Sequence, residues 1–188
     1  MLKRLIANWV YGGYLAGFLL VMLAPILVRG WPPALAATFL CLPVYMLHQY
    51  EEHDSDRFRL FVNKKIGAAR RGLSLAAVFV INVPGVWGIV AVSLWLAATI
   101  NLGFGLIAGY LLLVNSTFHI AHAIIFRGYN PGLISAIVLF LPLGGYCVYT
   151  VQQAGAGTAI MHSVGAGTAI AIHAAIIVYA LQKRPLQA

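Results

Sequence analysis

Long apolar stretches separated by short polar segments run through almost the whole of this 188-residue chain. A helix needs roughly 20 apolar residues to cross a hydrocarbon core about 30 Å thick. Runs of this length, without alternation of apolar and polar positions, favour helices over strands. The pattern predicts an all-α, polytopic membrane helix bundle with six transmembrane helices, which form a single domain over residues 1–188. The spans are expected at about residues 9–28, 32–50, 73–98, 103–126, 131–151 and 158–181.

Composition supports a membrane location. Hydrophobic residues make up 62% of the chain and charged residues 9%, whereas soluble domains carry roughly 25% charged residues. This chain has too few charged residues to cover the surface of a water-soluble globular protein. The formal net charge of +8 is no sign of nucleic-acid binding, because the basic residues lie between apolar stretches and not on one basic face. Membrane lipids are therefore the expected partners, and nucleic acid is not.

The basic residues also predict an orientation. Only Arg29 lies in the loops of one side, and the other eleven lie in loops that the six spans place on the opposite side. Because cytoplasmic loops carry the excess of Lys and Arg, both termini and the basic loop 53–72 are expected in the cytoplasm. The predicted location is a bacterial-type inner membrane. The eleven residues are Lys3, Arg4, Arg57, Arg59, Lys64, Lys65, Arg70, Arg71, Arg127, Lys183 and Arg184.

The first apolar segment has a second interpretation. Lys3 and Arg4 precede it, and the tripeptide Ala34-Leu35-Ala36 after it resembles the cleavage site of a secretory signal. However, the apolar run of about 20 residues exceeds the roughly 7–15 residues of a signal peptide. We therefore expect the segment to be retained as the first span.

Small residues and prolines predict how the spans pack and bend. Gly13 and Gly17, and likewise Gly105 and Gly109, have the G-x-x-x-G spacing that lets helix backbones approach closely in lipid. A proline within a span removes a backbone hydrogen bond and bends the helix. Pro84 is therefore expected to kink the third span.

All the acidic residues of the chain lie in one short window at the end of the second span. Glu51 and Glu52 follow His48, and Asp54 and Asp56 complete the window. At about 100° per residue, His48, Glu51 and Glu52 share an arc of roughly 100° on one helix face. Two adjacent carboxylates repel each other unless a proton or a cation intervenes, and imidazole with carboxylate suits zinc, iron or manganese.

An alternative interpretation treats the same acids as the start of a solvated loop, paired with Arg57 and Arg59. We keep this interpretation for Asp54 and Asp56, and we predict that Glu51 and Glu52 belong to a site.

The fourth span carries polar residues at helical spacing. Asn115, His119 and His122 follow one another at i, i+4 and i+7, within about 60° on one face. Ionisable residues within hydrocarbon are expensive and therefore indicate function. At 1.5 Å per residue, Asn82 in the third span and His173 in the sixth lie at a comparable depth from the cytoplasmic side. These two residues are weaker candidates for the same site.

Three motifs in this order resemble a known family. They are His48-x-x-Glu51-Glu52 at the end of the second span, Asn115-x-x-x-His119 in a later one, and Tyr129-Asn-Pro-Gly-Leu133 before the next. The chain is similar to the small integral membrane proteins named after their HXXEE motif. The resemblance implies an enzymatic role for the His and Glu residues, together with Asn115, without assigning a reaction.

The leading hypothesis is a metal-dependent hydrolase that acts on an amphipathic or lipid-like substrate at the cytoplasmic leaflet. One or two divalent ions, zinc or iron, would activate a water molecule. The glutamate that does not bind metal would be the general base, and Asn115 or Asn82 would orient the substrate. The expected catalytic residues are Glu51, Glu52 and Asn115, and the expected metal ligands are His48, Glu51, Glu52, His119 and His122.

Several alternatives stay open at this level. A di-iron oxidoreductase would use the same ligands, although the E-x-x-H pairs of ferritin-like sites are absent from the sequence. A proton or cation transporter would use the His and Glu residues as a relay, but the acids cluster at one surface and the spans show no inverted repeat. Haem binding by His119 and His173 and a non-catalytic scaffold are the remaining interpretations.

Overall fold

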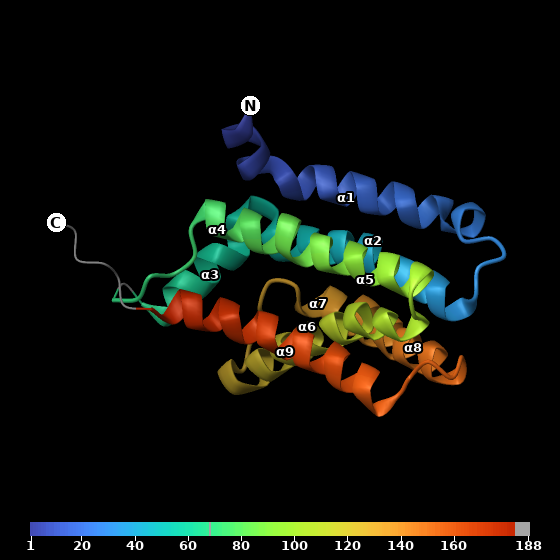
Figure 1. Ribbon diagram of the computed structural model, residues 1–188. Coiled ribbons are helices and arrows are strands. Elements are labelled where there is room, and N and C mark those ends of the chain that lie inside the picture. Colours follow the sequence, from blue (N-terminus) through green and yellow to red (C-terminus); the bar gives the residue numbers. More distant parts are fainter. Residues whose placement is uncertain (68, 183–188) are drawn as a thin grey trace.

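The computed structural model describes residues 1–67 and 69–182, and helices dominate it (Figure 1). Lys183 and Arg184, which contribute to the charge count above, lie outside the described residues. The helices are α1 (Leu2–Leu27), α2 (Pro33–His53), η1 (Asp54–Asp56), α3 (Arg57–Ile66), α4 (Leu75–Val80), η2 (Ile81–Trp87), α5 (Gly88–Thr99), η3 (Leu102–Phe104), α6 (Gly105–Phe126), α7 (Leu133–Ser135), η4 (Ala136–Phe140), α8 (Leu141–Gln153) and α9 (Ala159–Leu181).

The helices confirm an all-α, multi-pass membrane protein. Within the described part of the chain, five helical segments are long and apolar enough to span a membrane. The predicted second span corresponds to α2, which falls short because polar residues such as His48 and Gln49 lower the hydropathy of its last turns. The six-span count, the side of the termini and the type of membrane stay predictions. The five segments are Leu2–Leu27, Leu75–Thr99, Leu102–Phe126, Leu133–Gln153 and Ala159–Leu181.

α2 lies at the centre of the bundle, where it packs against α1, α5, α6 and α8. Glycines make the close approaches. A Cβ built on Gly17 of α1 would stand 2.8 Å from the Cβ of Met46 on α2, and one on Gly109 of α6 would stand 3.3 Å from Sγ of Cys147 on α8. The predicted close packing at the G-x-x-x-G spacings is therefore confirmed. Gly105 brings α6 against α2, because a Cβ built on this glycine would collide with Oγ1 of Thr38, and α2 and α6 carry the candidate site.

The third span is irregular at Pro84, where a kink was predicted. The proline lies inside η2, a π-helical segment between α4 and α5. Proline cannot donate the regular backbone hydrogen bond, and π-turns accommodate such breaks. The irregular turn carries Asn82 on its buried side.

The loop 53–72 contains a short helix, α3, which two ion pairs hold at its start. The Arg57 guanidinium lies 2.5 Å from the Asp54 carboxylate, and Arg59 pairs with Asp56. Burial alone would raise the pKa of Asp54, but hydrogen bonds from Tyr11 and Arg57 hold this pKa below its usual value. Asp54 and Asp56 are thus paired with the arginines, as the loop interpretation predicted.

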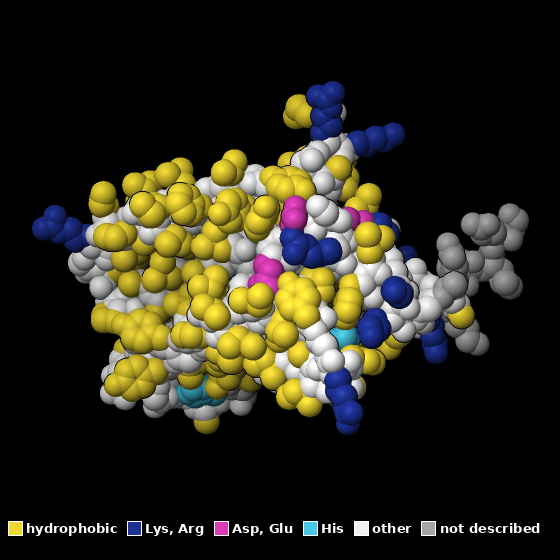
Figure 2. All heavy atoms as spheres, turned by 180° about the vertical axis from the view of Figure 1, so that it is seen from behind, with side chains coloured by type: hydrophobic (Ala, Val, Ile, Leu, Met, Phe, Trp, Pro, Cys, Tyr) yellow, Lys and Arg dark blue, Asp and Glu magenta, His cyan; other side chains and the backbone are white. Residues whose placement is uncertain are grey.

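The charges are distributed unevenly over the surface. Figure 2 shows Lys and Arg side chains gathered mainly at one end of the molecule, with the acidic side chains near them, while hydrophobic side chains cover the middle. Large apolar side chains such as Leu15, Met22 and Trp95 are among the exposed residues. An apolar belt with a basic end fits a protein that lies in a bilayer.

Candidate metal centre

Two imidazoles and one carboxylate meet between α2 and α6. His48 and Glu52 lie one turn apart on α2, and His119 projects from the buried face of α6. Nε2 of His48 and Nε2 of His119 each lie 3.6 Å from a carboxylate oxygen of Glu52. All three residues are buried, and their ligand atoms lie within 4.8 Å of one another. This geometry could hold a metal ion.

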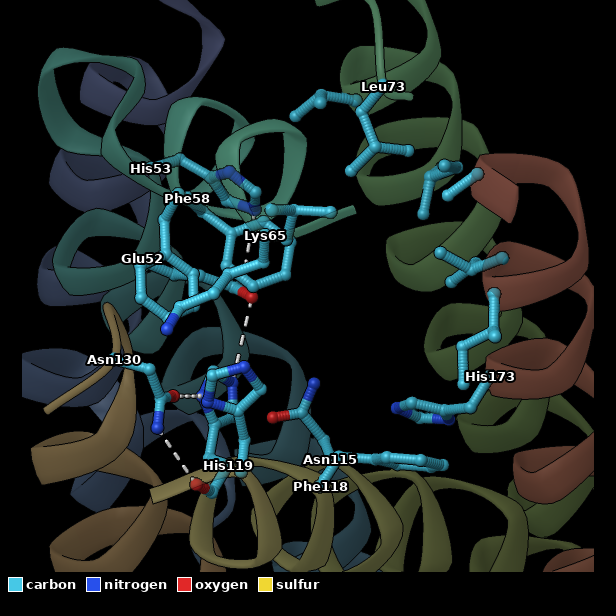
Figure 3. A pocket seen from close by; sticks show the side chains of 18 of the residues that line it. Glu52, His53, Phe58, Lys65, Leu73, Asn115, Phe118, His119, Asn130 and His173 are labelled. Atoms are coloured by element: carbon cyan, nitrogen blue, oxygen red, sulfur yellow. Dashed lines mark hydrogen bonds and ion pairs between the residues drawn. The ribbon is translucent and has the colours of Figure 1, made fainter. Parts of the chain in front are cut away.

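The orientation of His119 is fixed by Asn130, in the loop between α6 and α7. The Asn130 amide nitrogen donates to the backbone carbonyl of His119 at 2.9 Å, so its oxygen faces Nδ1 of the same residue at 2.6 Å (Figure 3). This amide oxygen can only accept a hydrogen bond. Nδ1 of His119 therefore carries a proton, and in the neutral imidazole the lone pair of Nε2 lies on the side of Glu52.

His48 is held in a similar way by Ser135. The Ser135 hydroxyl donates to the Glu51 carboxylate and lies 2.8 Å from Nδ1 of His48. Since its hydrogen goes to Glu51, the hydroxyl oxygen accepts from Nδ1. In the neutral imidazole Nε2 of His48 then carries the lone pair, and this buried atom has no hydrogen-bond partner among the described residues.

With both imidazoles neutral, two nitrogen lone pairs and a carboxylate converge in a buried space. Lone pairs and negative charge repel one another, and burial weakens the screening by water. A cation between His48, His119 and Glu52 would remove the repulsion. A metal-binding histidine typically donates the N–H of its other ring nitrogen to a hydrogen-bond acceptor. Nδ1 of His48 and Nδ1 of His119 face such acceptors in Ser135 and Asn130.

Glu51 lies behind His48 and outside the cluster of His48, Glu52 and His119. Its carboxylate accepts hydrogen bonds from the backbone N–H of Ile134 at 3.1 Å and that of Ser135 at 2.7 Å. The Tyr129 hydroxyl donates a third at 2.9 Å, and burial and this bond raise the pKa of Tyr129. Glu51 therefore supports the loop and, through Ser135, the ring of His48.

A cavity of about 550 Å³ opens beside Glu52 and His119. Figure 3 shows His173 facing this space from the opposite wall, and Asn115 between the two sides. Nδ1 of His173 bonds to the carbonyl of Ala169 at 2.8 Å. The buried Oδ1 of Asn115 has no partner within the described chain. Asn115 and His173 therefore line the cavity without reaching the three-residue cluster.

The two remaining predicted residues lie apart from the cluster. His122 lines the cavity between the rings of Phe61 and Phe126, whose centroids are 5.0 and 4.2 Å away. Asn82 accepts from Gln49 at 2.8 Å and donates to a backbone carbonyl at 2.8 Å. The side-chain groups of Asn82 are thus occupied in holding α2 to η2.

Three residues near the cluster were missed by the sequence analysis. Nε2 of His53 lies 3.2 Å from Glu52 and has no hydrogen-bond partner in the part of the chain described. At about 100° per residue, His53 lies about 140° around the helix from His48. The side chain of its neighbour Glu52 nevertheless reaches it. The family motif Tyr129-Asn-Pro-Gly-Leu133 contains Asn130 and ends two residues before Ser135. This motif was therefore the feature of the sequence that could have indicated both residues.

The fold and the cluster define a class: a multi-pass, all-helical membrane protein with a buried His/Glu group that could hold a metal. The chain belongs to the family described as protein of unknown function with HXXEE motif, whose family model matches residues 39–147. The matched region includes His48, Glu52 and His119 as well as Asn130 and Ser135. No curated protein and no solved structure matches the chain.

Proposed function

We propose that this protein is a membrane-embedded, metal-dependent enzyme, with His48, Glu52 and His119 as ligands of a divalent ion. The convergence of the Nε2 atoms of His48 and His119 on the buried carboxylate of Glu52 carries this proposal. Two nitrogens and one oxygen suit zinc or iron. Three protein ligands leave a coordination position open, as in catalytic zinc sites.

The proposed reaction is hydrolysis of an amphipathic or lipid-like substrate at the cytoplasmic leaflet. A bound metal supplies a water of lowered pKa and polarises the substrate carbonyl or phosphoryl group. The apolar cavity beside Glu52 would exclude bulk water and accept the substrate chain. Asn115, which lines the cavity with an unpartnered oxygen, is suited to orient the polar part of the substrate. Nε2 of His53 is suited to hydrogen-bond a water beside Glu52.

An oxidoreductase is the second candidate, and the observation in its favour is the set of ligand atoms. Two histidines and one carboxylate with open positions are the ligands of non-haem Fe(II) oxygenases. The identity of the metal separates the two reactions, because a zinc site supports hydrolysis and has no redox chemistry.

Elemental analysis of the full-length protein in mild detergent tests the metal site. We expect one zinc or iron per chain in the wild type and almost none in Glu52→Gln or His119→Ala. His162→Ala is the matched control, because His162 bonds Tyr110 and Gln152 away from the site. A folded wild type that binds no zinc, iron or manganese under equilibrium dialysis would overturn the proposal.

The reaction is tested on the same preparations. The zinc-loaded protein should release nitrophenol from 4-nitrophenyl dodecanoate, and Glu52→Gln should lose this activity while His162→Ala keeps it. If the iron-loaded protein consumes oxygen in the presence of an amphipathic substrate and does not cleave the ester, oxidation would replace hydrolysis as the proposed reaction.

A further inference from the structure

A lysine from α3 lines the same cavity as the proposed metal ligands. Lys65 is the one Lys or Arg among the described residues around this space. Its ammonium group lies 4.6 Å from the ring centroid of Phe126, at the end of α6, and 5.7 Å from that of Phe61. These cation–π contacts place the charge where α3 meets α6.

No carboxylate side chain of the protein neutralises Lys65. The sequence contains four acidic residues, and each has a partner elsewhere. Glu51 accepts hydrogen bonds from the loop before α7, and Glu52 faces the histidines. Asp54 and Asp56 pair with arginines at the start of α3. Lys65 is exposed at the edge of the cavity, so its charge remains available to the anionic group of a bound molecule.

Apart from the proposed ligands and polar side chains such as Asn115, His122 and His173, the walls of the cavity are apolar. Val78 and Ile81 line it from the third span, and Ile172, Ile176 and Ile177 line it from α9. The volume of about 550 Å³ falls within the range of roughly 300–1,000 Å³ typical of small-molecule sites. A space whose walls are mainly hydrocarbon, with one lysine at its exposed edge, matches a molecule with a hydrocarbon chain and one anionic group.

We propose that the cavity binds a single-chain amphiphile with an anionic head group, and that Lys65 is the residue that selects the negative charge. The further statement that this amphiphile is the substrate of the enzyme rests on the proposed function. Binding of the amphiphile itself needs no metal, so it is measured on protein stripped of metal with EDTA. The two proposals can then fail separately.

The test compares dodecyl phosphate with dodecanol, which share a chain and differ in head-group charge. Binding is measured by calorimetry on the full-length protein in nanodiscs of zwitterionic lipid. We expect the wild type to bind dodecyl phosphate more tightly than dodecanol. Lys65→Gln should weaken dodecyl phosphate binding about tenfold, the loss of one charge-assisted hydrogen bond, and should leave dodecanol binding unchanged.

Lys64→Gln is the matched control, because Lys64 is, like Lys65, an exposed lysine of α3 but does not line the cavity. An equal loss in Lys64→Gln would assign the effect to general attraction by the basic surface and overturn the proposal. Ala121→Phe, which narrows the cavity from α6, should weaken both ligands. Equal binding of the two ligands by the wild type, or no binding of either, would also overturn it.

The two proposals remain distinguishable in every outcome. Lys65→Gln should keep the metal content of the wild type, because Lys65 is not among the proposed ligands. A protein that holds metal but binds neither ligand refutes only the amphiphile site. A protein that binds dodecyl phosphate through Lys65 but holds no metal refutes only the metal site.

Discussion

Gly132 lies against the imidazole of His119, since a Cβ built on this glycine would stand 2.7 Å from Cε1 of that ring. The same Cβ would stand 2.9 Å from Cε1 of His48. The glycine also has a φ of +97°, a conformation that side chains with a Cβ rarely adopt. The loop before α7 can therefore close over both proposed ligands only because it carries glycine at this position.

Replacing Gly132 by alanine should displace both imidazoles and impair metal binding. We expect the metal content of Gly132→Ala to fall well below that of the wild type, together with a backbone strain of about 1 kcal/mol. Gly155→Ala is the control, because Gly155 has a φ of +73° and a Cβ built on it would meet nothing within 4 Å. Elemental analysis and thermal unfolding of both variants check this prediction. Equal metal content in the two variants would contradict it.

Asn130 should control metal affinity without binding the metal. Asn130→Ala removes the acceptor for Nδ1 of His119, and losses of such supporting partners typically weaken metal binding about 10- to 100-fold. Asn130→Asp retains an acceptor oxygen and should recover most of the affinity. Competition with a chelator of known affinity measures the change. If the aspartate variant is as weak as the alanine variant, hydrogen bonding to Nδ1 is not the cause.

Glu51 and Ser135 should act on the metal through one path. Glu51→Gln and Ser135→Ala each disturb the bond to Nδ1 of His48, so each should weaken metal binding less than Glu52→Gln does. Their effects should not add, because residues in one hydrogen-bond network are coupled.

The sequence analysis predicted a different result for Glu51, as a direct ligand. In that case Glu51→Gln would abolish metal binding as fully as Glu52→Gln, and Ser135→Ala would add its own effect. A double-mutant cycle on metal affinity, with thermal unfolding of each variant as a check of the fold, separates the two roles.

Much of the fold was predictable because it depends on local patterns. Apolar runs, glycine spacing and Pro84 indicated the five long apolar helical segments, their close contacts and the irregular turn in η2. Hydropathy predicts the second span least clearly, because the last turns of α2 are polar. These turns can be polar because α2 packs among other helices, where its polar side chains are buried in protein.

The site was predictable only in part, because helical spacing does not show what a distant loop will contact. His48, His119 and the pair of glutamates followed from position on α2 and α6. The two glutamates are adjacent and looked equivalent on the helix face, but backbone N–H groups of the loop before α7 bind Glu51 and leave Glu52 to the histidines. That division depends on contacts more than eighty residues apart in the chain.

Asn82 provides the last prediction, which separates a structural role from a role in the site. Its oxygen accepts from Gln49, whose own oxygen accepts from Nε1 of Trp87 at 2.5 Å. Asn82→Ala leaves the buried amide of Gln49 without its acceptor, and an unsatisfied buried donor costs about 1–3 kcal/mol. We therefore expect a lower free energy of unfolding for Asn82→Ala, and metal content equal to that of the wild type.

The control for this prediction is Asn8→Ala, which removes an exposed asparagine that bonds only to the carbonyl of Arg4 among the described residues. This variant should unfold like the wild type, because water replaces the lost partner. Denaturant unfolding in detergent, followed by tryptophan fluorescence, measures the difference. If Asn82→Ala unfolds normally but loses the metal, Asn82 acts in the site, as the depth of the residue in the third span first indicated, and the link between α2 and η2 does not depend on it.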